Sequence, residues 1–169
     1  MVDITGKSFI AMVQCRSAHG EGLVDYLRRD DVAGSGWLVQ TDEPGQAMTL
    51  RFDYVGHTPL RMHYRISAHA AGLYSKASLG VSRNGYLGLY HVAGVIDYLK
   101  LEIVPSEGEP DCFEFFMRDR RGYRVKVSRE DRSNFYFGFD RRGPNDVVNF
   151  LNVEKGEAAH FGAKIIQYL

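Results

Sequence analysis

Hydrophobic and polar residues alternate along several short stretches of this chain. In "LRFDY", Leu50 and Phe52 alternate with Arg51 and Asp53. A period of two residues is typical of a half-buried β-strand, because successive side chains of a strand point to opposite faces of the sheet. The same alternation recurs in residues 62–66, 99–103, 113–117, 148–152 and 161–165. The pattern therefore predicts an all-β protein built of short strands.

Turn-forming residues separate the predicted strands at regular places. The tetrapeptides "DEPG", "HVAG" and "DRRG" each lie between two of these strands. An aspartate at the first turn position bonds to its own backbone, and a glycine at the last position tolerates a positive φ. We therefore expect a positive φ at Gly45, Gly94 and Gly143. The dipeptide Asn84-Gly85 is a strong signal for a further hairpin.

The chain also resembles itself when it is shifted by 49 residues. One column of this alignment is aromatic, one is glycine and one is large and apolar: Trp37, Tyr86 and Phe135; Gly45, Gly94 and Gly143; Phe52, Leu101 and Phe150. Agreement in several columns without a gap indicates a four-stranded unit written three times. The repeats are expected over residues 8–67, 77–119 and 123–168, within a single domain that spans residues 1–169.

The first copy departs from the other two in residues 17–35, which are expected to be an insertion. Within it, "EGLVDYLRR" places Leu23, Tyr26 and Leu27 on one helical face. The spacing predicts a short helix that packs over the strands. A loop of this length in a compact domain is often functional.

Three pseudo-symmetric four-stranded repeats of about 49 residues resemble the β-trefoil superfamily. That resemblance implies six strands that close a barrel and six that form a cap of three hairpins. A threefold β-prism is the alternative architecture; the trefoil is favoured because the last strand of each unit runs with little break into the next unit. Ricin-type lectins carry a Gln-x-Trp signature, but the single tryptophan, Trp37, follows Gly36. No ricin-type sugar site is therefore implied.

Composition narrows the function classes. Lysine plus arginine and aspartate plus glutamate both number 21, so the formal net charge is zero. This balance argues against nucleic-acid binding, which needs a basic face; the local run "RDRRGYRVKVSREDR" is interpreted as solvated strand and turn positions. No apolar run is long enough for a membrane span, no signal peptide is seen, and two cysteines fit a reducing compartment. We expect a cytoplasmic protein, with non-classical secretion left open.

Catalytic and cofactor motifs are missing from the sequence. It contains no HExxH, no Cys-x-x-Cys, no phosphate-binding loop and no G-x-S-x-G. The six histidines are scattered, and Cys15 falls in a column with Ser82 and Ser128, which indicates a structural position. We therefore expect a protein that is not an enzyme and that holds neither a cofactor nor a metal.

The candidate site is selected by the side-chain chemistry that sugar recognition requires. Acidic or amide side chains pair with sugar hydroxyls, and an aromatic ring lies against the apolar face of the sugar. In the trefoil lectins that the chain resembles, shallow pockets lie between the cap hairpins and neighbouring loops. The hairpin turns and their neighbours supply the ligand-binding candidates Asp140, Asp146, Asn145, Tyr136, Asp97, His91 and Asp42. The third copy is the most polar and is the first choice, and Tyr98 and Tyr90 are further candidate platforms.

Two functions follow from these observations. The leading hypothesis is a lectin-like, carbohydrate-binding protein whose partner is a glycan or glycoprotein. The alternative is a protein-binding trefoil, such as a protease inhibitor or an accessory subunit, that uses the insertion 17–35 as its contact surface. Tyr26, Leu27, Arg28 and Arg29 would then meet the protein partner, although packing of the insertion on its own domain explains the apolar pair equally well.

Overall fold

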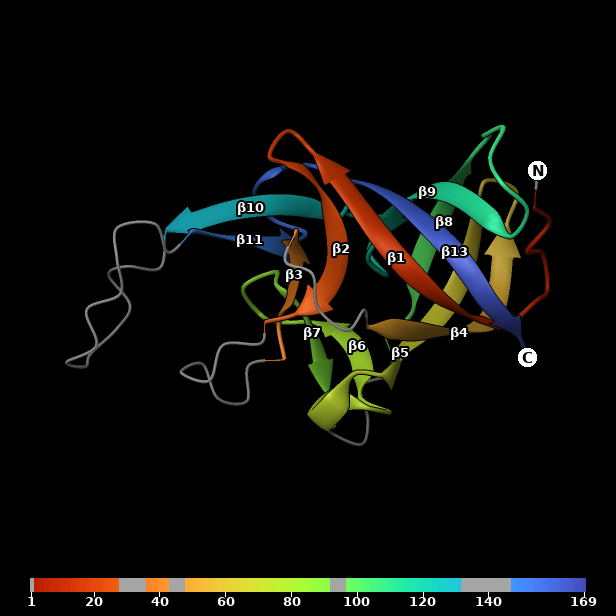
Figure 1. The fold of residues 1–169 in the computed structure, drawn as a ribbon, viewed down its shortest axis with the longest axis horizontal. Coiled ribbons are helices and arrows are strands. Elements are labelled where there is room, and N and C mark those ends of the chain that lie inside the picture. The colour runs from red at the N-terminus through yellow and green to blue at the C-terminus, as the bar shows by residue number, and fades with distance from the viewer. Residues whose placement is uncertain (1, 28–35, 43–47, 92–96, 132–146) are drawn as a thin grey trace.

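The computed structural model describes residues 2–27, 36–42, 48–91, 97–131 and 147–169, and these residues form thirteen β-strands and one turn of 3-10 helix (Figure 1). The elements are β1 (Phe9–Ser17), β2 (Gly20–Tyr26), β3 (Leu38–Thr41), β4 (Thr49–Thr58), β5 (Arg61–Ala70), η1 (Gly72–Tyr74), β6 (Ser78–Val81), β7 (Leu87–Tyr90), β8 (Leu99–Val104), β9 (Cys112–Arg118), β10 (Lys126–Asp131), β11 (Val147–Asn152), β12 (Glu157–Ala158) and β13 (His160–Tyr168). The predicted all-β class is confirmed.

Six of these strands pair edge to edge into a closed ring. The order is β1, β4, β5, β8, β9, β13 and back to β1, and every pair is antiparallel. The first and last long strands therefore lie side by side, as the red and blue ribbons show (Figure 1). Closure leaves none of the six strands with an unpaired edge, which removes the usual template for aggregation.

Aromatic rings fill the inside of the ring. Phe9 stacks on Phe52 with 4.8 Å between ring centroids, and Tyr64 meets Phe9 edge-on at 5.4 Å. The Tyr64 hydroxyl donates to the carbonyl oxygen of Ile4 at 2.9 Å, so its polar end is satisfied although the side chain is buried. The alternation predicted for β9 is also confirmed, because every second residue of that strand is buried.

Three hairpins extend from the ring, formed by β2–β3, β6–β7 and β10–β11. Their second strands meet one another: Val39 on β3 pairs with Phe150 on β11, and isolated bridges join Trp37 to Gly88 and Tyr86 to Asn152. At this meeting point the Trp37 ring stacks on Tyr86 at 5.0 Å and meets Phe150 edge-on at 5.7 Å. A second, smaller apolar cluster forms there.

Two sequence-based expectations about local structure are wrong. Residues 20–26 form strand β2, not a helix, and that strand pairs with both β1 and β3. Phe52, Leu101 and Phe150, which the 49-residue shift aligns, are all buried, but they do not occupy equivalent positions. Phe52 and Leu101 lie on ring strands β4 and β8, whereas Phe150 lies on hairpin strand β11.

The predicted hairpin at Asn84-Gly85 is confirmed, and it joins β6 to β7. Gly85 has a φ of 82°, and its amide donates to the Ser82 carbonyl oxygen at 3.0 Å. Only glycine takes such a conformation without strain. The three other glycines for which a positive φ is expected, Gly45, Gly94 and Gly143, lie outside the described residues.

Candidate functional site

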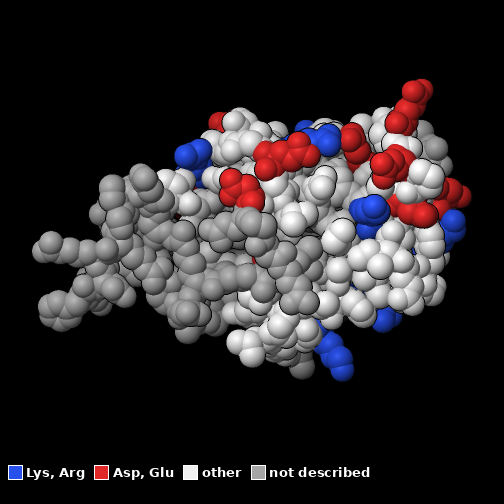
Figure 2. Space-filling view, viewed as in Figure 1, with Lys and Arg blue, Asp and Glu red and all other residues white. Residues whose placement is uncertain are grey.

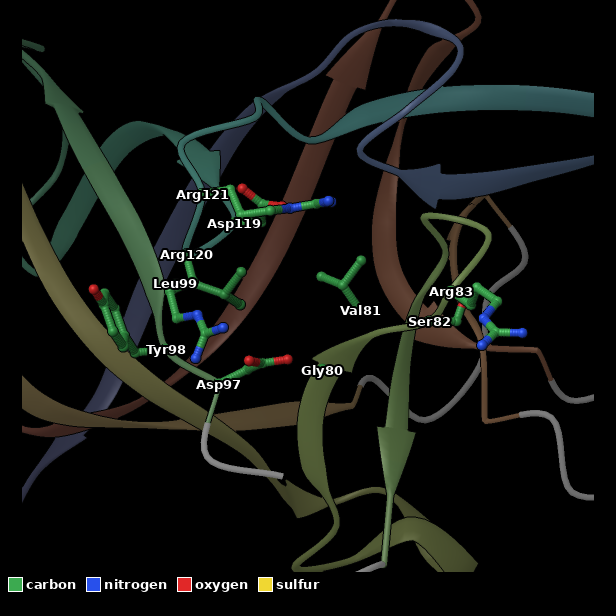
Figure 3. Close-up of a pocket in the computed structure, with 10 residues that line it drawn as sticks. All are labelled: Gly80, Val81, Ser82, Arg83, Asp97, Tyr98, Leu99, Asp119, Arg120 and Arg121. Atoms are coloured by element: carbon green, nitrogen blue, oxygen red, sulfur yellow. The ribbon is translucent and has the colours of Figure 1, made fainter. Parts of the chain in front are cut away.

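A cavity of roughly 360 Å³ opens where a hairpin meets two ring strands (Figure 3). Its walls come from three segments: residues 80–83 at the end of β6, residues 97–99 at the start of β8, and the turn 119–121 after β9. The cavity, here called the Asp97 cavity, is lined by Gly80, Val81, Ser82, Arg83, Asp97, Tyr98, Leu99, Asp119, Arg120 and Arg121.

The turn after β9 is held by its own aspartate. The Asp119 carboxylate is buried, accepts from the Tyr123 amide at 2.8 Å and accepts from Arg121 Nε at 3.0 Å. The Gly122 amide closes the turn by donating to the Asp119 carbonyl oxygen at 3.0 Å. Asp119 is therefore a structural residue of the rim. It keeps Arg120, which is exposed, at the edge of the cavity.

The opposite rim is equally well ordered by local hydrogen bonds. Ser82 Oγ accepts from the Tyr86 amide at 3.1 Å, and the Ser82 amide donates to the Tyr86 carbonyl oxygen at 2.8 Å. The Ser82 hydroxyl thus accepts a hydrogen bond from the backbone of the turn and helps to close it between β6 and β7. Arg83 follows directly and is exposed on the rim.

Between these rims lies the carboxylate of Asp97. Within the part of the chain that the structure describes, the Asp97 carboxylate and the Arg83 and Arg120 guanidinium groups form no hydrogen bond and no ion pair. Val81 and Leu99 supply apolar wall between them. The cavity thus combines an acceptor, several donors and a small apolar surface, which suits a ligand rich in hydroxyl groups.

The structure brings only part of the predicted site together. Asp97 lines the cavity, but Asp42 and His91 are exposed outside it. The His91 ring bonds through Nε2 to the Leu73 carbonyl oxygen at 2.8 Å. Tyr98 also lines the cavity, yet its ring stacks on His63 at 5.1 Å, so one face is already covered. The third-copy candidates Tyr136, Asp140, Asn145 and Asp146 lie outside the described residues.

Sequence reasoning missed the arginines of the cavity. Arg120 and Arg121 belong to the run that was interpreted as solvated turn positions, and Arg83 sits in the "SRNG" hairpin. The sequence did contain a feature that could have identified these arginines, because each lies in a turn beside a predicted strand. Which turns would face one another depended on strand pairing across distant parts of the chain, and the sequence pattern does not specify that.

A second cavity, of about 670 Å³, lies against β1, β9 and β13. Two of its charged groups already pair with each other: Arg16 Nη1 bonds to Glu114 at 3.2 Å, and Arg16 Nε bonds to Glu21 at 3.1 Å. Acidic side chains gather toward the end of the molecule where the two termini lie (Figure 2). The Asp97 cavity is smaller, but of the two it is the one lined by a residue, Asp97, that the sequence identifies as a ligand-binding candidate.

Two of the residues proposed for a protein-contact surface pack against the rest of the chain. Tyr26 lies against Tyr74 with 5.0 Å between ring centroids, and Leu27 packs on the smaller apolar cluster. Arg28 and Arg29 lie outside the described residues. The use of this surface by a protein partner stays a prediction.

Groups that could bind a metal, and the thiol of Cys15, were the remaining chemical candidates in the described ranges. No group of three or more His, Cys, Asp or Glu side chains there could hold a metal ion. Burial raises the pKa of the Cys15 thiol to about 12, which keeps it protonated and unreactive. No helix among the described residues is long and apolar enough to cross a membrane.

Comparison of the chain with family models, with curated proteins and with solved structures found no match. Function is therefore inferred from the Asp97 cavity and its residues.

Proposed function

We propose that the chain is a β-trefoil. Three features support this: a closed ring of six strands, three hairpins outside it, and contact between the second strands of those hairpins. In this proposal the repeats extend over residues 8–67, 77–119 and 123–168. Residues 17–35 are the insertion by which the first copy differs from the other two. Strands β12 and β13 then end the third copy.

We further propose that the protein binds carbohydrate, without catalysis, at the Asp97 cavity. The observation that carries the proposal is the Asp97 carboxylate, which has no partner in the described part of the chain and lines a cavity together with Arg83 and Arg120. A carboxylate accepts hydrogen bonds from two adjacent sugar hydroxyls, while guanidinium groups donate to hydroxyl or ring oxygens. A volume of roughly 360 Å³ lies at the lower end of ligand pockets and suits one or two sugar rings.

The test is the change Asp97→Asn. A glycan array first identifies a bound sugar, and calorimetry with that sugar then compares the variant with the parent. Loss of a charged acceptor should weaken binding about ten- to a hundredfold, because a hydrogen bond to a charged group contributes roughly 1.5–3 kcal/mol. Asp42→Asn is the matched control, since Asp42 is exposed outside the cavity. Absence of glycan binding by the parent, or equal affinity of parent and Asp97→Asn, would refute the proposal.

The third copy stays a second proposed site. If Asp140 and Asp146 also hold a sugar, binding to the parent should show two sites, and Asp97→Asn should weaken only one of them. The double change Asp140→Asn with Asp146→Asn should remove the other. If the parent shows one binding site and the double variant binds as the parent does, the third copy does not bind sugar. The Asp97 cavity is then the remaining candidate.

A further inference from the structure

Three arginines surround a single glutamate on the outer face of the ring. Glu102, on β8, is approached by Arg118 Nε at 3.0 Å, by Arg61 Nε at 3.5 Å and by Arg124 Nη2 at 3.9 Å. The four side chains come from β5, β8, β9 and the segment before β10, and each is partly buried. They are called the arginine cluster below.

The donors of the arginine cluster are used unevenly. Arg118 donates from Nε to Glu102 and from Nη1 to the Gly122 carbonyl oxygen, both at 3.0 Å. Arg124 lies over the Phe116 ring, with its guanidinium carbon 4.0 Å from the ring centroid, which fixes its plane. Arg61 Nε is shielded from solvent and has no hydrogen-bond acceptor among the described residues. An unsatisfied buried donor of this kind is often explained by a water or an ion.

Positive charge exceeds negative charge at this place. Three guanidinium groups share one carboxylate, so among the described residues positive charges outnumber negative ones in these ion pairs by two. The hydrogen bond from Arg118 lowers the pKa of Glu102, and the charges of Arg118, Arg124 and Arg61 act in the same direction. Burial lowers the pKa of the nearby His63, and the charges of Lys100, His57 and Arg61 contribute to that shift.

Two other arginines on the ring strands, Arg16 and Arg51, have at least one carboxylate each. Arg16 bonds to two carboxylates, Glu21 and Glu114, so positive charge is not in excess there. On β4, Arg51 pairs with Asp53 at 2.8 Å. The excess of arginine over carboxylate groups therefore distinguishes the arginine cluster from the ion pairs of Arg16 and Arg51.

We propose that the arginine cluster binds an oxyanion, namely a sulfate, phosphate or carboxylate group carried by a ligand. Planar guanidinium groups present parallel N–H donors that match such groups, and Arg61 and Arg124 hold most of the unused donors. The anion lies between Arg61 and Arg124 and competes with Glu102 for them. No member of the cluster lines the Asp97 cavity, so the proposed anion site lies outside it.

Inorganic sulfate, inorganic phosphate and acetate are the probes, titrated separately at constant ionic strength held with sodium chloride. The readout is the ¹H–¹⁵N resonance of Arg61 Nε. A saturable shift with sulfate or phosphate, but not acetate, identifies a tetrahedral group, whereas acetate alone identifies a carboxylate. Arg61→Gln and Arg124→Gln, followed through backbone amides of β5 and β8, should each weaken binding about tenfold. Arg51→Gln removes the same charge from a compensated pair and should leave affinity unchanged.

Glu102→Gln gives the opposite expectation. Removal of the competing carboxylate should tighten sulfate or phosphate binding severalfold, provided that the melting temperature shows a folded protein. Parent protein that shows no saturable shift with any of the three anions overturns the proposal. So does an Arg51→Gln variant that loses as much affinity as Arg61→Gln, because the effect would then be one of net charge alone.

Discussion

At the scale of single residues, the turn that forms one rim of the Asp97 cavity depends on Gly85. A Cβ atom there would lie 2.8 Å from Asn152 Oδ1, in addition to the strain of a φ of 82°. Gly85→Ala should therefore lower the free energy of unfolding by about 1–3 kcal/mol. Gly162→Ala, on β13, meets no atom within 4 Å and should change it by less than about 0.5 kcal/mol. Urea denaturation measures both, and equal stability of the two variants would contradict this account of the turn.

The candidate site was only partly predictable at this scale. Asp97 was identified from its position beside a hairpin turn, and the structure places it in a cavity. Arg83 and Arg120 were not, because their importance comes from having no partner in the described residues. That property depends on which turns face one another. A pattern along the chain carries no information about it.

At the scale of elements, period-two alternation was a reliable guide where one strand face is buried. It failed for β2, since Leu23, Tyr26 and Leu27 also fit a helix. Pairing with β1 and β3 outweighed that local spacing, and two glycines, at positions 20 and 22, make a helix less favourable there. Tertiary context overrides weak local preference in such short segments.

The 49-residue shift also holds only between some elements. It relates β3 to β7 and Phe52 on β4 to Leu101 on β8. It fails for Phe150, which belongs with Trp37 and Tyr86 at the meeting point of the hairpins. The shift had assigned Phe135 to that column, and Phe135 lies outside the described residues. Phe150 lies further along the chain than a shift of 49 residues from Tyr86 would place it, so the third unit is longer than the second at this point. Apolar columns alone do not reveal such a difference in length.

The meeting point of the hairpins gives a prediction of its own. Phe150 is fully buried against Trp37 and Tyr86, so Phe150→Ala should cost about 3–5 kcal/mol. Because Trp37 is the single tryptophan, its emission should shift to longer wavelength in the folded variant as water reaches the ring. Tyr123→Ala, at an exposed position, is the control and should change neither stability nor emission. An unchanged Trp37 spectrum in Phe150→Ala would argue against the contact.

At the scale of the whole molecule, the ring joins the two ends of the chain. β13 pairs with β1 along most of its length, and the Leu169 amide donates to the Ser8 carbonyl oxygen at 2.9 Å. Both termini lie at the same end of the molecule (Figure 1). The ring therefore forms only when strands from the start and the end of the chain are both present, and most of its pairings are distant in sequence. Such a topology favours slow but cooperative folding.

This closure predicts that connectivity matters less than the presence of every ring strand. A circular permutant with a glycine–serine linker of about ten residues between the old termini, opened between Glu107 and Gly108 in the exposed β8–β9 connection, keeps all six ring pairings. It should unfold cooperatively in a thermal scan followed by circular dichroism. A chain that ends at Ala159 lacks β13, which leaves β1 and β9 with open edges and exposes the Phe115 ring that packs on Phe161. It should lose the cooperative transition. Were the shortened chain to melt at the parent's temperature while the permutant failed to fold, the order of the chain, and not closure of the ring, would be what holds the molecule together.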